Sequence, residues 1–138
     1  MTSIKQIKWV SLNSNSDKRG TLTVLDNQTL DSFTIQRMFY MHDIKMDRGG
    51  HSHIETDQFI IGIHGSFKGI FKTPTNTMEV TFNDPTKALH VPRMIFTEFE
   101  NFTPDSVCLV VSNTIYDPAK SLRNWKDYLA YIHNNTTE

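Results

Sequence analysis

The sequence predicts an all-β protein: an antiparallel barrel or double-layered sheet with one C-terminal helix. Short apolar runs lie close together along the chain, separated by turn residues such as Asn83-Asp84-Pro85, and this pattern is typical of sandwiches and barrels. The sequence lacks long helical patterns between the runs, which argues against βαβ units. The runs that predict strands are Ile7–Leu12, Thr21–Leu25, Phe33–Met41, Phe59–Ile63, Ser66–Phe71, Met78–Phe82, Ala88–Val91, Ile95–Phe99 and Val107–Ser112.

The C-terminal end of the chain has a helical pattern instead. Asp117 is a suitable N-cap residue, and Pro118 suits the first helical position. We therefore predict one amphipathic helix from about Pro118 to His133, packed on the sheets through an apolar stripe. The stripe consists of Leu122, Trp125, Leu129 and Ile132.

Composition limits the classes of function. The length of 138 residues predicts one domain over residues 1–138. The formal net charge of -1 gives no broad basic field for nucleic acid, so a nucleotide ligand would need locally placed arginine or lysine. No segment approaches ~18 consecutive apolar residues, and the N-terminus lacks a signal peptide pattern. We expect no membrane span and, by default, a cytoplasmic protein.

The segment Arg48-Gly49-Gly50-His51-Ser52-His53 is the most informative one for chemistry. In an extended strand, residues i and i+2 point to the same face, so His51 and His53 project together. Histidine titrates near neutral pH, and such a pair can accept and donate protons. Two histidines at this spacing also occur as ordinary surface residues, and the spacing alone does not separate the two interpretations.

Arginine placement matters for a phosphorylated ligand, because a guanidinium group matches phosphate in a bidentate way. Arg19 lies in a turn and Arg48 directly precedes the histidines. Arg37 interrupts the apolar run Phe33–Met41, so an inward-facing Arg37 needs a partner.

Together these segments resemble the sugar-nucleotide 3,4-ketoisomerases, WxcM-like cupins that act on dTDP-4-keto-6-deoxyglucose. The resemblance extends from about Asp17 to Tyr128, and the order and spacing of its segments are fairly specific. The matching segments are Asp17–Leu22, Phe33–Tyr40, Arg48–His53, Gln58–Ser66 and Tyr116–Pro118, followed by Leu122, Arg123 and Tyr128.

The resemblance implies a cupin or jelly-roll antiparallel barrel that forms a homodimer by exchanging N-terminal strands. It implies a dTDP-linked deoxysugar substrate, and neither a metal nor another cofactor. It also implies the site residues. The catalytic ones are His51, His53 and Arg37, and the substrate-binding ones are Arg19, Gly20, Arg48, Gln58 and Thr97.

The sequence departs from the family pattern at three places. Phe39 replaces the tyrosine that shares a strand face with the family's arginine, and Tyr40 alternates to the other face. Ile54 stands where the family commonly has lysine, and Phe96-Thr97 replaces a Trp-His pair. The missing hydroxyl at Phe39 affects the proton relay.

Thr97 also bears on a metal site. Metal-binding cupins typically add a carboxylate and a third histidine to the HxH pair. Asp57 lies where the carboxylate could be, but Thr97 occupies the later strand where the third histidine would come. Zn²⁺ usually takes three or four protein ligands. We therefore expect activity without a bound divalent cation.

The implied reaction moves a keto group from C4 to C3 of the sugar through an enediol, with histidines transferring protons and Arg37 stabilising the enediolate oxygen. A sugar-nucleotide 3,5-epimerase is an alternative, because it begins with the same removal of the C3 proton. A non-catalytic nucleotide-sugar-binding cupin is another, which Phe39 and Thr97 leave open. The HxH pair and the C-terminal pattern favour the ketoisomerase.

Overall fold

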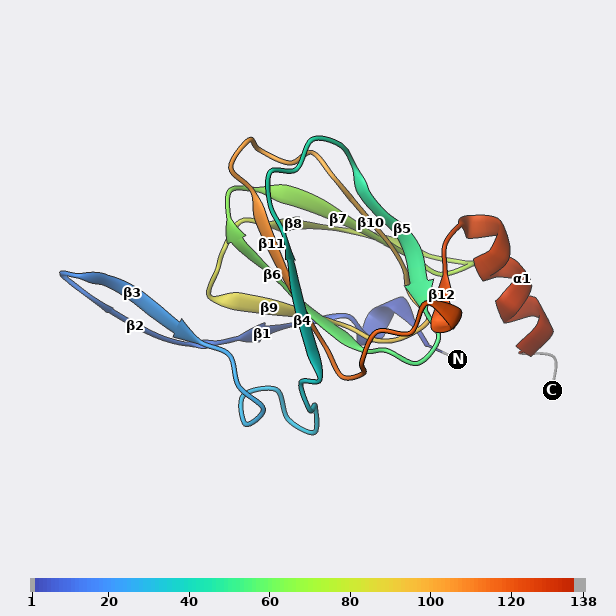
Figure 1. Ribbon diagram of the computed structural model, residues 1–138, viewed down its shortest axis with the longest axis horizontal. Helices are drawn as coiled ribbons and strands as arrows, with labels where there is room; N and C mark the ends of the chain where they lie inside the picture. Colours follow the sequence, from blue (N-terminus) through green and yellow to red (C-terminus); the bar gives the residue numbers. More distant parts are fainter. Residues whose placement is uncertain (1, 136–138) are drawn as a thin grey trace.

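The computed structural model describes residues 2–135, and its main body is two five-stranded antiparallel sheets (Figure 1). A 3-10 helix, η1 (Ile4–Gln6), precedes the strands. The strands of the first sheet, in spatial order, are β1 (Lys8–Ser11), β9 (Lys87–Val91), β6 (Gln58–His64), β11 (Val107–Ser112) and β4 (Arg37–Met41). Those of the second are β12 (Ser121–Leu122), β5 (Arg48–His53), β10 (Phe96–Glu100), β7 (Phe67–Lys72) and β8 (Thr77–Phe82).

One apolar core joins the inner faces of the two sheets. Phe67 and Phe82 stack with ring centroids 4.9 Å apart, and they pack in the same cluster as Ile60 and Leu89 from the first sheet. Fully burying side chains of this size stabilises a fold by roughly 1.5–3 kcal/mol each. The core therefore fixes the two sheets as one unit, and the all-β fold class with one C-terminal helix is confirmed. Within residues 2–135 no strand pairing joins β4 to β12 or β5, so these edges leave the layers open on one side.

A two-stranded hairpin extends away from the sheets and forms an arm (Figure 1). It consists of β2 (Asn13–Asp17) and β3 (Gly20–Val24), and every residue of β2 is exposed. The polar sequence of β2 contains no apolar run, so the sequence does not predict this strand. Pairing with β3 along its whole length holds it in place, together with a 2.7 Å hydrogen bond between the Ser16 and Thr21 hydroxyls.

The predicted strand over Phe33–Met41 is shorter in the structure. Regular pairing begins only at Arg37, where β4 joins β11. Phe33 and the preceding Leu30 instead cover the outer face of the first sheet, where the Phe33 and Phe59 rings meet edge to face at 4.8 Å. The apolar residues at the start of this run therefore serve a second core.

The predicted helix from Pro118 to His133 begins too early. Asp117 and Pro118 start only the one-turn 3-10 helix η2 (Pro118–Lys120), and the chain then extends into β12. The α-helix α1 (Trp125–Asn135) begins after a second cap, in which Asn124 Oδ1 accepts a 2.8 Å hydrogen bond from Asp127 N.

The α-helix begins later than predicted because the residues between η2 and α1 pair with the free edge of β5 as the strand β12. The apolar stripe of α1 is correspondingly shifted. Tyr128 and Ile132 are its buried residues, and Trp125 packs on Phe96 with ring centroids 5.3 Å apart. Leu129 is exposed. Among the helices of residues 2–135, none is long and apolar enough to span a membrane.

Candidate active site

The His51 and His53 side chains lie on the inner face of β5 and contribute to one interior cavity. Their ring centroids are 5.6 Å apart, and both line a cavity of about 70 Å³ between the sheets. Ser52 alternates to the other face and is fully buried. The i, i+2 geometry predicted for the pair is therefore present, and the histidines face a cavity and not the open surface.

The glycine before the histidines has a steric role. Gly49 has φ +87°, and a Cβ added there would lie 2.7 Å from the carbonyl oxygen of Thr97. β5 thus approaches β10 more closely than a side chain would permit. The pairing shifts register between Thr97 and Glu98, and His51 lies opposite Thr97. This irregularity sets which residues of β5 face the cavity.

Burial and positive charge keep both imidazoles neutral at pH 7. The pKa of His51 is lowered first by burial and then by the charge of Arg123. The pKa of His53 is lowered to about 4, first by burial and then by His51, Arg37 and Arg123. Neutral imidazoles have one nitrogen free to accept a proton.

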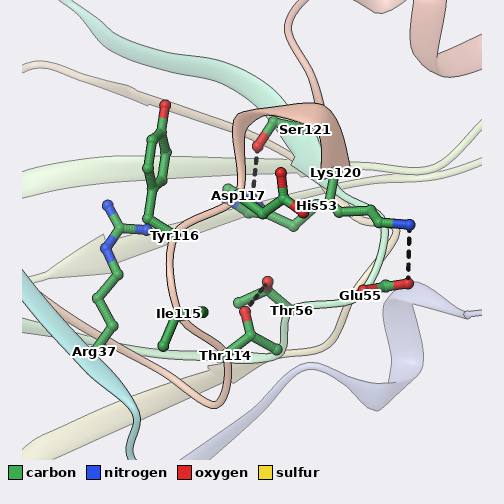
Figure 2. Close-up of a pocket in the computed structure, with 10 residues that line it drawn as sticks. All are labelled: Arg37, His53, Glu55, Thr56, Thr114, Ile115, Tyr116, Asp117, Lys120 and Ser121. Atoms are coloured by element: carbon green, nitrogen blue, oxygen red, sulfur yellow. Dashed lines mark hydrogen bonds and ion pairs between the residues drawn. The ribbon is translucent and has the colours of Figure 1, made fainter.

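His53 also lines a second cavity, of about 130 Å³ (Figure 2). Arg37 lies on its wall, and the two aromatic rings beside it are the partners that an inward-facing Arg37 needs. The Arg37 guanidinium lies 4.8 Å from the centroid of the Phe39 ring and 4.7 Å from that of Tyr116. Rings on a guanidinium hold its orientation and leave its N–H groups free for an anion.

Arg123 is a cation that our sequence reasoning did not include in the site. Its Nη2 donates a 3.1 Å hydrogen bond to the Tyr116 hydroxyl, which links it to the ring beside Arg37. Within residues 2–135, no carboxylate lies within 4.0 Å of the side-chain nitrogens of Arg37, Arg48 or Arg123. Arg37 and Arg48 thus line the two cavities without an acidic partner among the described residues, and Arg123 adds a third positive charge that acts on both histidines. The family-like pair Leu122-Arg123 was the available signal in the sequence.

The structure separates the predicted substrate-binding residues into two groups. One group, Arg48, Gln58 and Thr97, lines the first cavity together with both histidines. Arg19 and Gly20 lie at the tip of the β2–β3 hairpin, away from the sheets (Figure 1). The Arg19 side chain is 85% exposed and pairs with Asp17 at 2.6 Å. The fold of one chain therefore does not bring Arg19 and Gly20 to the histidines.

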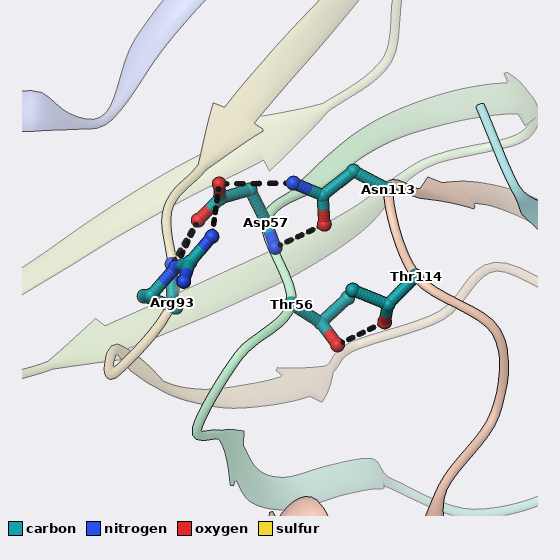
Figure 3. A network of polar contacts seen from close by, with 5 residues as sticks. All are labelled: Thr56, Asp57, Arg93, Asn113 and Thr114. Carbon is teal, nitrogen blue, oxygen red and sulfur yellow. Dashed lines mark hydrogen bonds and ion pairs between the residues drawn. The ribbon is translucent and has the colours of Figure 1, made fainter. Parts of the chain in front are cut away.

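Asp57, the carboxylate considered as a metal ligand, belongs to a structural network (Figure 3). Its Oδ1 accepts from the Arg93 backbone N–H at 2.8 Å, and its Oδ2 accepts from Arg93 Nη2 and Asn113 Nδ2, each at 3.1 Å. Burial alone would raise the Asp57 pKa, but the hydrogen bonds from Arg93 outweigh burial and lower it. Across residues 2–135 no group of three or more His, Cys, Asp or Glu side chains is placed to hold a metal ion.

Two antiparallel sheets with a histidine-lined cavity between them are the architecture of a cupin. The chain belongs to the FdtA family, described as WxcM-like, C-terminal, whose model matches residues 5–133. The predicted relationship to the sugar-nucleotide 3,4-ketoisomerases is therefore confirmed, and so is the jelly-roll fold class.

Characterised relatives agree with this family. The chain is 27% identical over 127 residues to a TDP-4-oxo-6-deoxy-α-D-glucose-3,4-oxoisomerase of Aneurinibacillus thermoaerophilus, covering 91% of each chain. It superposes on the H51N mutant of the 3,4-ketoisomerase QdtA of Thermoanaerobacterium thermosaccharolyticum, in complex with TDP-4-keto-6-deoxyglucose, with a TM-score of 0.91, 26% identity and coverage of 99% of this chain and 100% of that one. It superposes on a TDP-quinovose 3,4-ketoisomerase of Campylobacter jejuni with a TM-score of 0.85 and 30% identity, covering 92% of this chain and 99% of that one.

Proposed function

We propose that this protein is a TDP-sugar 3,4-ketoisomerase that converts TDP-4-keto-6-deoxyglucose to a TDP-3-keto-6-deoxyhexose. The observation that carries the proposal is the pair His51 and His53 on one cavity wall, in a chain of the 3,4-ketoisomerase family. Relatives of more than 25% identity that act on, or bind, this keto sugar support the choice of substrate.

The reaction needs only proton transfers. One imidazole takes the C3 proton, which the C4 ketone acidifies, and the electron pair forms the C3–C4 double bond of an enediolate. A proton passes from O3 to O4, C4 receives a proton, and the C3 carbonyl forms, so atoms and electrons balance within the sugar. His53 can accept a proton as a neutral imidazole and return it as an imidazolium. Arg37 stabilises the enediolate oxygen.

Charge supports a diphosphate-linked substrate. Arg37, Arg48 and Arg123 approach the cavities without carboxylate partners among the described residues. Like charges that lie near one another repel, and a bound anion relieves this repulsion. A diphosphate bound among the arginines would offset their charge at the histidines and raise the pKa values of His51 and His53 toward neutrality. Binding of the nucleotide diphosphate thus adjusts the pKa values of the two histidines that act on the sugar.

The exposed hairpin supports a homodimer with exchanged N-terminal strands. Leu22 on the hairpin is 61% exposed, and Met38 and Tyr40 on the outer face of the edge strand β4 are 60% and 61% exposed. An unpaired strand edge can pair with another chain, and exposed apolar side chains beside it favour such an interface. In such a dimer the hairpin of one subunit places Arg19 and Gly20 at the cavity of the other. Light scattering should give twice the 16.0 kDa chain mass at micromolar concentration, and a monomer mass throughout that range contradicts this arrangement.

The proposed reaction is tested by NMR of the product. Chelator-treated enzyme is incubated with TDP-4-keto-6-deoxyglucose in deuterated buffer, and we expect a 3-keto sugar with deuterium at C4. A product with inverted configuration at C3 or C5 and its keto group still at C4 identifies an epimerase. Binding without any solvent exchange identifies a non-catalytic cupin. Activity that requires one added metal contradicts the expected metal independence.

A further inference from the structure

The two-residue strand β12 fixes one side chain beside the histidine pair. Ser121 lies directly opposite His53 in the pairing of β12 with β5. The chain is held on the preceding side as well, because Asp117 Oδ1 accepts from Ala119 N at 3.0 Å and the carbonyl of Lys120 accepts from Ile54 N at 2.9 Å. Ser121 is therefore held in place by the strand pairing and by the hydrogen bonds of the residues before it.

The Ser121 hydroxyl contacts one ring nitrogen of His53. Ser121 Oγ lies 3.3 Å from His53 Nδ1 (Figure 2). The backbone at His53 is also fixed, since its carbonyl accepts from Met94 N at 2.8 Å. The two ring nitrogens of histidine are distinct, and the hydrogen bond at one of them decides which tautomer is present. No carboxylate hydrogen-bonds to His53 within residues 2–135.

We propose that Ser121 is a positioning residue that accepts a hydrogen bond from His53 Nδ1–H and so leaves Nε2 as the proton acceptor. This inference rests on the proposed function, in which His53 is a proton carrier. The direction of the bond follows from the chemistry of the cycle. When Nε2 takes a proton, the imidazolium has protons on both nitrogens, so only an accepting oxygen at Nδ1 keeps its bond in both states. A donating hydroxyl would lose its bond at the moment of proton transfer.

A serine is a suited partner in this electrostatic setting. The charged groups that line the two cavities with His53 are Arg37, Arg48, Asp117, and Lys120 with Glu55, which pair at 3.3 Å. Arg123, after β12, adds a further positive charge. Asp117 Oδ1 accepts from Ala119 N, and neither Asp117 nor Glu55 hydrogen-bonds to His53. A carboxylate at Nδ1 would also fix the tautomer, but its charge would hold the imidazolium and oppose release of the proton. A neutral hydroxyl orients the ring and leaves the protonated form acidic.

The test uses three substitutions at Ser121 and one control. Ser121→Ala removes the acceptor, Ser121→Cys keeps the approximate volume with a much weaker acceptor, and Ser121→Thr keeps the hydroxyl. Thr81→Ala is the matched control, because Thr81 is an exposed hydroxyl residue on β8, the opposite edge strand of the same sheet. Circular dichroism establishes that each variant is folded.

The first readout is ¹⁵N NMR of the His53 ring in the ligand-free protein. We expect a protonated Nδ1 and a bare Nε2 in the wild type, in Ser121→Thr and in Thr81→Ala. Ser121→Ala and Ser121→Cys should move toward the Nε2–H form. A wild type with Nε2–H, or an unchanged tautomer in both Ser121→Ala and Ser121→Cys, overturns the proposal.

The second readout is turnover of TDP-4-keto-6-deoxyglucose. We expect kcat to fall about 10-fold in Ser121→Ala and Ser121→Cys, the lower end of the loss when a group that orients a metal-bound histidine is removed. KM should change less than about twofold, and Ser121→Thr should restore most of kcat. An unchanged kcat in both variants overturns the role of Ser121. If the wild type itself is inactive, the proposed function fails, and the tautomer measurement still decides what Ser121 does to His53.

Discussion

The β5 strand and the β2–β3 hairpin both supply residues predicted to bind substrate, but the chain places them in opposite surroundings. β5 lies between β10 and β12, and it directs His51 and His53 into a cavity with Arg48. The hairpin pairs only with itself in the sheets of residues 2–135. Neighbouring strands thus give β5 a fixed inner face, whereas the hairpin pairs with no further strand of the described residues.

The largest effect should come from the side of this comparison that faces the cavity. His51→Asn or His53→Asn keeps much of the side-chain shape but removes proton transfer near neutral pH. A general acid–base group typically contributes ~10²–10⁴-fold in rate, so we expect kcat to fall by that factor in either variant. Affinity for TDP, measured by calorimetry, should be little changed. Near-normal turnover in both folded variants would mean that the pair is structural.

Arg19→Gln tests whether the hairpin completes the cavity of another subunit. Loss of one charge-assisted hydrogen bond costs about 1.5–3 kcal/mol, so KM should rise at least about 10-fold. Coexpression of Arg19→Gln with His53→Asn then separates the two possible arrangements. If the hairpin reaches across, each mixed dimer contains one intact site, and activity measured well below the wild-type KM exceeds the mean of the two parents. Activity equal to that mean shows that Arg19 acts in its own subunit or not at all.

The same contrast explains what the sequence could predict. Alternation within a strand is a local pattern. It is enough to place His51 and His53 on one face of β5, and Arg37 and Phe39 on one face of β4. Apolar runs marked the strands that contribute to the cores. The polar strand β2 gave no such signal, because its stability comes from the strand beside it.

Contacts between distant parts of the chain were beyond the reach of local patterns. Ser121 and Arg123 lie about 70 residues after the histidines, and β12 exists only because β5 has a free edge to pair with. The capping signal at Asp117 was correctly recognised, but it starts one turn of helix and not the long one. Nothing local distinguishes a helix that continues from one that a neighbouring strand interrupts.

Acid should destabilise the cavity side of the molecule more than the hairpin. The pKa of His53 is lowered from 6.5 to about 4 in the folded protein, first by burial. Between those pH values the unfolded chain binds a proton that the folded protein does not, so the free energy of unfolding falls as the pH decreases. His53→Asn should therefore lose less stability between pH 7 and pH 5 than the wild type does.

Asp17→Asn on the hairpin serves as the control for this pH dependence. The pKa of Asp17 is lowered from 3.8, chiefly by the hydrogen bond from Arg19, so its contribution is lost only below about pH 4. The free energy of unfolding, measured with urea at pH 7, 6 and 5, should change with pH in Asp17→Asn as it does in the wild type. If the free energy of unfolding of His53→Asn changed with pH as that of the wild type does, His53 would titrate normally in the folded state.

The smallest effects should come from single hydroxyl groups, and their signs should differ between the two regions. Ser52 and Ser112 are fully buried, and their hydroxyls have no hydrogen-bond partner among the described residues. An unsatisfied buried group costs about 1–3 kcal/mol, so Ser52→Ala or Ser112→Ala should leave the free energy of unfolding unchanged or raise it by up to about 1 kcal/mol.

Ser16 on the hairpin is exposed, but its hydroxyl hydrogen-bonds to that of Thr21 at 2.7 Å. Ser16→Ala should lower stability by about 0.2–1 kcal/mol, the usual scale of a cross-strand pair. Urea denaturation with equal m-values measures all three. If both buried substitutions were the more destabilising ones, their hydroxyls would have partners, such as bound water, that stabilise the sheets.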